Sequence, residues 1–159
     1  MDTVYIETTI PSAYFERRPQ PKMVARREWT RDWWDNQRQK YDLVTGFAVV
    51  EELSRGSHPD KNEKLALVSD VDILAANEAI AEIVQVYVAR FVMPRDPVAD
   101  ALHLALASYY KADILLTWNC NHLANANKAG HIRRINAILG LHVPMITTPL
   151  ELLGKGPEE

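Results

Sequence analysis

The chain has 159 residues, of which 47% are hydrophobic and 25% are charged. This composition is that of an ordinary globular protein and excludes a disordered or collagen-like chain. The length suits one folded unit, so we expect residues 1–155 to form a single domain and residues 156–159 a short tail. Neither a signal segment nor an apolar run of the roughly 20 residues that cross a membrane is visible, so we expect a soluble, cytoplasmic protein with no membrane contact.

The formal net charge of −3 is distributed unevenly along the chain. The segment from Arg17 to Lys40 contains eight basic and three acidic residues, a net +5, which leaves −8 for the rest. Binding to a polyanion requires a local positive field rather than a positive total. The negative total therefore does not exclude a nucleic-acid partner.

The N-terminal half alternates short apolar runs with helical spacings. Residues 4–6 predict a buried strand that ends at Glu7, and the polar and proline residues at 8–11 predict a turn. Residues 22–39 contain neither Pro nor Gly and repeat apolar side chains at four-residue intervals, which predicts an amphipathic helix. The remaining elements expected in this half are a strand at 43–45, helices at 47–53 and 60–68, and a strand at 71–74.

The C-terminal half continues the alternation. A helix is expected at 77–91, and Asp96 and Pro97 predict the cap and first residue of a helix that runs to about 111, with Asp100 in its opening turn. Residues 114–117 are a continuous apolar run, as in strands buried on both faces. A polar loop at 119–128, helices at 131–139 and 149–153, and a strand at 144–147 complete the prediction. The whole pattern favours a three-layer α/β domain with a mainly parallel sheet.

Four polar side chains are expected at one edge of this sheet, where parallel strands end and ligands bind. Glu7 ends the first strand, Glu52 lies one turn into a helix, Asp100 opens another helix, and Asn119 follows a strand. At 100° per residue, Glu52 lies about 105° from the apolar direction of its helix and the neighbouring Glu51 about 155°, so Glu52 is the better ligand. Converging carboxylates repel one another unless a cation is present, and Mg²⁺ and Mn²⁺ prefer oxygen ligands.

Four segments carry a family resemblance. The segments Val4–Thr9, Glu51–Leu53, Asp100–Ala107 and Leu115–Asn119 resemble, in order and spacing, the acidic blocks of PIN-domain proteins, which include the VapC-like toxins of toxin–antitoxin pairs. The resemblance spans residues 3–153. It implies a PIN fold and a Mg²⁺- or Mn²⁺-dependent endoribonuclease in which a metal-activated water attacks the phosphorus.

The resemblance also assigns roles to residues. It implies that Glu7, Glu52 and Asp100 hold the metal and that Asn119 occupies the fourth acidic position of the catalytic site. The chain departs from the family pattern at two of these positions. Glu7 stands where Asp is usual, one methylene longer, and Asn119 stands where Asp is common, so the site offers less negative charge to a second ion.

The basic segment and the asparagine-rich loop allow more than one interpretation. Arg26, Arg27, Arg31 and His122 are candidate RNA contacts, although His122 and Asn119 can equally belong to a capping loop. The tryptophans of the basic helix can stack on bases, belong to the core, or support a homodimer or antitoxin contact. His103, three residues after Asp100, is interpreted as structural.

Two other functions remain open on the sequence alone. The first alternative is a PIN-like module with a weak site that binds RNA or a protein partner without cleavage. The second is a domain whose acidic pocket binds a small phosphorylated ligand, as in a phosphotransfer receiver, although the basic helix has no role in it.

Overall fold

The computed structural model describes residues 1–90, 92 and 98–154. Its centre is one five-stranded sheet in which neighbouring strands run parallel, in the order β3-β2-β1-β4-β5. The strands are β1 (Thr3–Ile6), β2 (Asp42–Gly46), β3 (Asp72–Leu74), β4 (Ile114–Leu116) and β5 (Met145–Thr147). The five predicted strands and the parallel sheet are thus confirmed.

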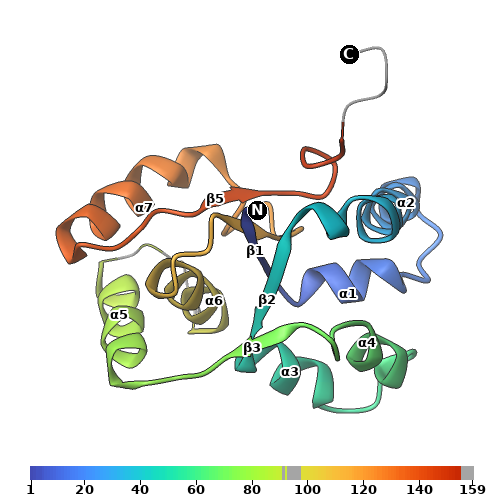
Figure 1. Ribbon diagram of the computed structural model, residues 1–159, viewed down its shortest axis with the longest axis horizontal. Coiled ribbons are helices and arrows are strands. Elements are labelled where there is room, and N and C mark those ends of the chain that lie inside the picture. Colours follow the sequence, from blue (N-terminus) through green and yellow to red (C-terminus); the bar gives the residue numbers. More distant parts are fainter. Residues whose placement is uncertain (91, 93–97, 155–159) are drawn as a thin grey trace.

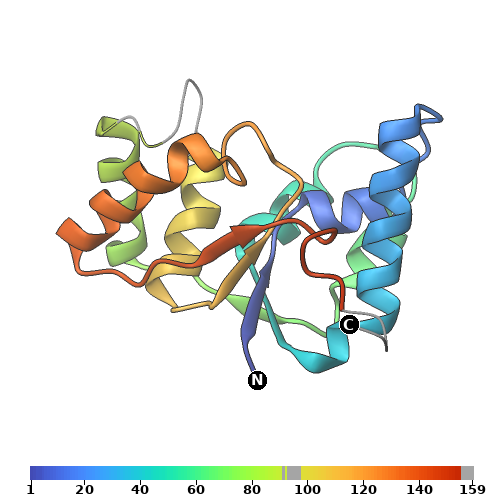
Figure 2. The same cartoon turned by 90° about the horizontal axis from the view of Figure 1, so that it is seen from above.

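Helices cover both faces of the sheet (Figures 1 and 2). The helices are α1 (Thr9–Tyr14), α2 (Pro21–Asn36), α3 (Phe47–Ser54), α4 (Lys61–Leu67), α5 (Glu78–Ala89), α6 (Val98–Tyr109) and α7 (Ala126–Leu139), with a short 3₁₀ helix at Arg38–Lys40. In both views α5, α6 and α7 lie on one side of the sheet and α1, α2 and α4 on the other. The predicted three-layer α/β architecture is confirmed.

The core is centred on the two middle strands. Residues 4–6 of β1 and 114–116 of β4 are all buried, because helices cover both faces of these strands and leave no side for polar residues. On α2, Trp33 and Trp34 are also buried, and Trp29 stacks on Trp118 with ring centroids 6.1 Å apart. The tryptophans of the basic helix therefore belong mainly to the core.

Three predicted elements differ from those observed. Residues 9–14 form helix α1 rather than a turn, because Pro11 lies in the first helical turn, where its missing N–H costs no hydrogen bond. Helix α7 begins at Ala126 rather than 131, after Asn125 accepts a hydrogen bond from the Asn127 N–H at 2.9 Å. Residues 149–152 form a turn instead of a helix. The predicted cap at Asp96 and Pro97, and the tail at 156–159, lie outside the described residues.

None of the helices within 1–90 and 98–154 combines the length and the apolar character that crossing a membrane requires.

Candidate metal centre

The strand order brings the ends of β1 and β4 together. From β1 the chain first builds the sheet toward β3 and later returns to add β4 on the other side, so the crevice between β1 and β4 is the switch point where ligands bind in parallel α/β sheets. The Glu7 N–H donates to the Leu116 carbonyl at 3.2 Å, which joins the two strand ends. Side chains that follow β1 and β4 therefore meet in one place.

Glu7 is a buried carboxylate in this crevice, with only 4% of its surface exposed. Its Oε1 accepts hydrogen bonds from the hydroxyls of Thr9 at 2.5 Å and Thr117 at 2.6 Å. Its Oε2 accepts from the Thr9 backbone N–H at 3.2 Å. These donors orient the side chain, but no Lys or Arg of the described residues forms an ion pair with it. The Glu7 side chain is thus oriented by hydroxyl and backbone donors and by no lysine or arginine of the described residues.

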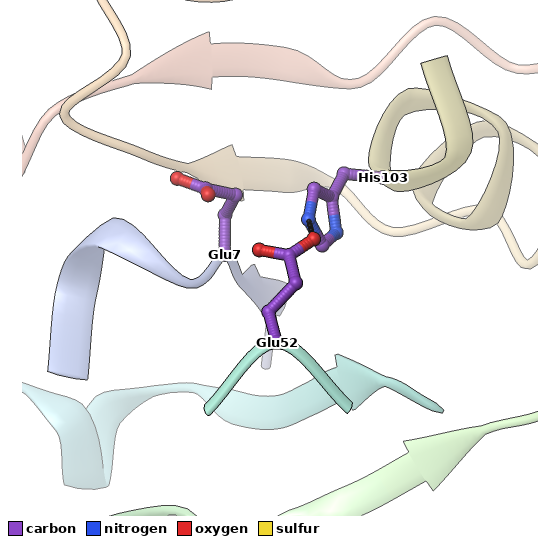
Figure 3. A group of neighbouring side chains, drawn as sticks. All are labelled: Glu7, Glu52 and His103. Atoms are coloured by element: carbon purple, nitrogen blue, oxygen red, sulfur yellow. Dashed lines mark hydrogen bonds and ion pairs between the residues drawn. The ribbon is translucent and has the colours of Figure 1, made fainter. Parts of the chain in front are cut away.

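Glu52 reaches the same crevice from α3 (Figure 3). Its side chain is 25% exposed, whereas that of the neighbouring Glu51 is 60% exposed, which agrees with the orientation expected from helical geometry. His103 on α6 contacts the Glu52 Oε1 through Nε2 at 2.9 Å. Ligand atoms of Glu7, Glu52 and His103 all lie within 4.8 Å of one another. We call these three residues the carboxyl-edge cluster.

Within the cluster, Glu52 and His103 stabilise each other's charged forms. Burial favours the neutral form of Glu52, but the hydrogen bond and charge of His103 outweigh burial and lower the pKa of Glu52. Burial would lower the pKa of His103, but the hydrogen bond to Glu52 and then the charge of Glu7 raise it. The Thr8 hydroxyl also lowers the pKa of Glu52, although it is buried and makes no hydrogen bond of regular geometry among the described residues. The cluster therefore favours an ionised Glu52.

Asp100 and Asn119 lie next to this cluster and contact each other. The Asn119 Nδ2 donates to the Asp100 Oδ1 at 3.0 Å, and its Oδ1 accepts from the His122 backbone N–H at 3.0 Å. The His122 ring lies 3.0 Å from the Asp100 Oδ2 through Nδ1. Asp100 is close enough to His103 to contribute to the raised pKa of that imidazole. The structure thus groups Glu7 with Glu52, and Asp100 with Asn119 and His122, in adjoining positions.

The candidate RNA contacts on α2 have different surroundings. Arg27 pairs with Glu28 at 3.0 Å and donates to the Glu16 carbonyl at 3.3 Å. Arg31 donates to the Tyr14 carbonyl at 2.8 Å. Arg26 instead lies over the Trp118 ring, 5.1 Å from its centroid, one residue before Asn119. Of these three arginines, Arg26 is the one beside the crevice.

The sequence interpretation missed part of this site. His103 was interpreted as structural, yet it is 1% exposed and contacts Glu52 directly. Its position three residues after Asp100 was the available signal, because residues at this spacing lie on neighbouring parts of one helix face. Thr9 and Thr117, which orient Glu7, were assigned only to a turn and to a strand.

Comparison with known proteins gives a structural similarity and no sequence match. No protein-family model matches the chain, and neither does any of the curated proteins. A chain of VapBC-1 from nontypeable Haemophilus influenzae is similar with a TM-score of 0.52 and 16% identity, over 92% of this chain and 98% of that one. A chain of VapBC2 from Rickettsia felis, bound to a DNA fragment from their promoter, gives 0.49 and 13% over the same shares.

At 16% identity, the similarity to the VapBC-1 chain concerns the fold alone. The similarity extends over nearly the whole of both chains and so includes the five-stranded parallel sheet described above. The predicted PIN-like α/β fold is therefore confirmed.

Proposed function

We propose that this chain is a metal-dependent endoribonuclease that hydrolyses RNA phosphodiester bonds, and that it is the toxin of a toxin–antitoxin pair. The observation that carries the proposal is the meeting of Glu7 and Glu52 at the switch point, with ligand atoms inside a 4.8 Å cluster. A buried and a half-buried carboxylate this close are costly to bring together without a cation. The site is therefore suited to a divalent ion.

The donor set fits Mg²⁺ or Mn²⁺. Both ions prefer oxygen ligands, and Mg²⁺ is commonly held by one or two carboxylates, waters and substrate phosphate. In the proposal Glu7 and Glu52 hold the ion, and Asp100 completes the ligand set from the adjoining position. When bound, such an ion lowers the pKa of a coordinated water and stabilises negative charge on phosphate oxygens.

The other site residues orient these ligands. Thr9 and Thr117 keep the Glu7 carboxylate at the end of β1. The Asn119 Nδ2 donates to the Asp100 Oδ1, and its Oδ1 accepts from the His122 N–H, so in the proposal Asn119 positions Asp100 instead of binding the ion. This arrangement supports a site with a single ion.

The substrate and partner follow from the fold and the charge distribution. RNA contacts are proposed for Arg26, Arg27, Arg31 and His122, with Arg26 beside the crevice. The similar solved chains come from VapBC-1 and VapBC2, which supports the proposal of an antitoxin partner. A homodimer remains part of the proposal and is tested by the molar mass in solution.

The proposed activity is tested with the purified full-length chain and labelled single-stranded RNA. Mn²⁺ or Mg²⁺ should support cleavage, EDTA should stop it, and Asp100→Asn should abolish it while circular dichroism stays unchanged. Equal cleavage by wild type and Asp100→Asn would identify a contaminating nuclease. In that case binding of intact RNA would support the alternative of a non-cleaving module.

The toxin role has a separate readout. Induced expression in a bacterial host should arrest growth, and expression of Asp100→Asn should not. Growth arrest by both forms would show that the arrest does not depend on the acidic site and would contradict the toxin mechanism.

A further inference from the structure

The carboxyl-edge cluster is linked to a second buried polar side chain. The Tyr5 hydroxyl lies 2.8 Å from the His103 Nδ1, while the His103 Nε2 contacts Glu52. Tyr5 belongs to β1 and is fully buried, and the rings of Tyr5 and His103 meet edge to face with centroids 5.8 Å apart. Three elements, β1, α6 and α3, thus form one chain of hydrogen bonds that ends at a proposed metal ligand.

The proton positions in this chain follow from the acceptors. An ionised carboxylate has no proton to donate, so the contact between His103 and Glu52 requires a hydrogen on Nε2. This holds for both the neutral and the charged imidazole. A nitrogen that carries this hydrogen has no lone pair for a metal, and the other ring nitrogen is occupied by the Tyr5 hydroxyl. The ring therefore acts as a hydrogen-bond donor to Glu52 and not as a ligand in this arrangement.

The local structure is built to accommodate the Tyr5 hydroxyl. A β-carbon at Gly46, the last residue of β2, would lie 2.2 Å from that oxygen and 2.6 Å from a methyl carbon of Leu106. A side chain at this position would displace the hydroxyl that fixes the His103 ring. Glycine leaves the space in which this hydroxyl sits.

From these contacts we propose that His103 is a positioning residue. It holds the Glu52 carboxylate toward Glu7 through Nε2–H (Figure 3). Tyr5 fixes the orientation of the ring. Glutamate has three rotatable side-chain bonds, and a carboxylate that is held before binding loses less conformational freedom when the ion arrives. Hydrogen bonds to metal ligands commonly change metal affinity by about 10–100-fold. The inference rests on the proposed metal site and deepens it.

Mn²⁺ affinity of the full-length chain tests the role without RNA. His103→Ala should weaken binding by about 10–100-fold, as expected for the loss of a hydrogen bond to a ligand. His103→Gln, whose terminal amide can donate to Glu52, should restore most of the affinity. Tyr5→Phe should give a smaller loss, because the donor remains but its orientation is less fixed. The matched control is His131→Ala, which removes a histidine that contacts the Arg90 carbonyl away from the cluster.

Two results with these variants would overturn the proposal. The first is wild-type affinity in a folded His103→Ala protein. The second is a His103→Gln protein that binds as weakly as His103→Ala, which would identify the imidazole itself as a ligand. The melting temperature of each variant without the ion shows whether the variant is folded. The rise in melting temperature on addition of the ion then shows whether the folded variant binds it.

NMR of the wild-type protein provides a test that needs no variant. Long-range ¹H–¹⁵N correlation of the His103 ring should detect hydrogen on Nε2 before and after addition of Mg²⁺. Loss of this hydrogen on Mg²⁺ binding would overturn the positioning role. Mn²⁺ binding without RNA cleavage would contradict only the proposed nuclease, whereas absence of any Mn²⁺ binding by the wild type would overturn both.

Discussion

Two groups of buried polar side chains in this molecule solve the same physical problem in different ways. The first is the carboxyl-edge cluster of Glu7, Glu52 and His103. The second, which we call the interhelix network, consists of Tyr87 on α5 and its partners Ser108 on α6 and Asn136 on α7, all at most 1% exposed. Buried polar groups are costly unless they are hydrogen-bonded, so both groups must be satisfied locally.

The interhelix network is neutral and closed. The Tyr87 hydroxyl donates to the Asn136 Oδ1 at 2.6 Å, and the Asn136 Nδ2 donates to the Ser108 Oγ and the His142 carbonyl, each at 3.0 Å. Each polar atom of the Asn136 side chain has a partner. The network therefore ties three helices together.

The carboxyl-edge cluster is charged and open. Two carboxylates share the space with one imidazole, and Glu52 is half-buried rather than enclosed. We therefore expect the neutral group to contribute to stability and the charged group to serve the proposed ion binding. Substitutions in the two groups should consequently affect different measurements.

The largest expected effect is on cleavage by the Glu52→Gln variant. Removal of a charged ligand from the proposed ion site should lower the cleavage rate by at least about a hundredfold, more than the loss of a hydrogen bond to a ligand costs. Rates are measured at saturating Mn²⁺ with labelled RNA. Glu51→Gln, one residue away and exposed, is the matched control and should change the rate by less than about twofold. If the Glu52→Gln protein keeps more than half of the activity, Glu52 is not a ligand of the proposed ion.

The next effect is on stability and concerns Asn136→Ala. This change removes the hydrogen bonds of Asn136 to Tyr87, Ser108 and the His142 carbonyl and leaves Tyr87 and Ser108 only their longer mutual contact of 3.4 Å. It should lower the free energy of unfolding by about 2–4 kcal/mol. Urea unfolding measures this difference, and the exposed Asn121→Ala provides the control. Cleavage by the folded variant should match wild type, and a large loss of cleavage without loss of stability would contradict the division between the two groups.

The sequence predicted the strands of the sheet more accurately than the helices that surround it. Continuous apolar runs at 4–6 and 114–117 identified the central strands, because strands covered on both faces have no polar side. Helix α1 was missed because Pro11 and two threonines are typical of turns, and only the following chain decides whether such a start continues as a helix. The longer α7 was missed because Asn favours both loops and caps.

The candidate site was predicted in its carboxylates but not in the groups that orient them. Glu7 and Glu52 follow a strand and a helix start, and such positions can be located from local patterns. His103 contacts Tyr5, which lies 98 positions earlier in the chain, and Glu52, which lies 51 positions earlier. A spacing rule along one helix cannot predict such a contact, because it depends on how α6 packs against β1 and α3.

A smaller effect is expected in the pH dependence of the stability that Tyr87 of the interhelix network contributes. Burial is the main cause that raises the pKa of Tyr87 to about 12, against 10.0 for an ordinary tyrosine. Since the unfolded chain loses this proton more readily, the contribution of Tyr87 is complete below pH 10 and is lost as pH rises toward 12. The difference in unfolding free energy between wild type and Tyr87→Phe should shrink across this range. A difference independent of pH would show that Tyr87 is ionised equally in both states.

The smallest expected effect is on RNA binding and concerns Arg26, which lies beside the carboxyl-edge cluster. Arg26 lies over Trp118 beside the crevice and forms no ion pair within the described residues, whereas Arg27 is paired with Glu28. If Arg26 contacts an RNA phosphate, Arg26→Gln should weaken RNA binding to a similar extent for all sequences.

The salt dependence of binding measures this contact on the non-cleaving Asp100→Asn background. Loss of one phosphate contact should lower the slope of log affinity against log salt by about 0.7 for single-stranded RNA. Arg27→Gln is the matched control and should lower it less, because its guanidinium already contacts Glu28 and the Glu16 carbonyl. Equal slopes for Arg26→Gln and the parent would show that Arg26 contacts no phosphate, because a cation that contacts no phosphate releases no counterion. The bound RNA would then not pass beside Trp118.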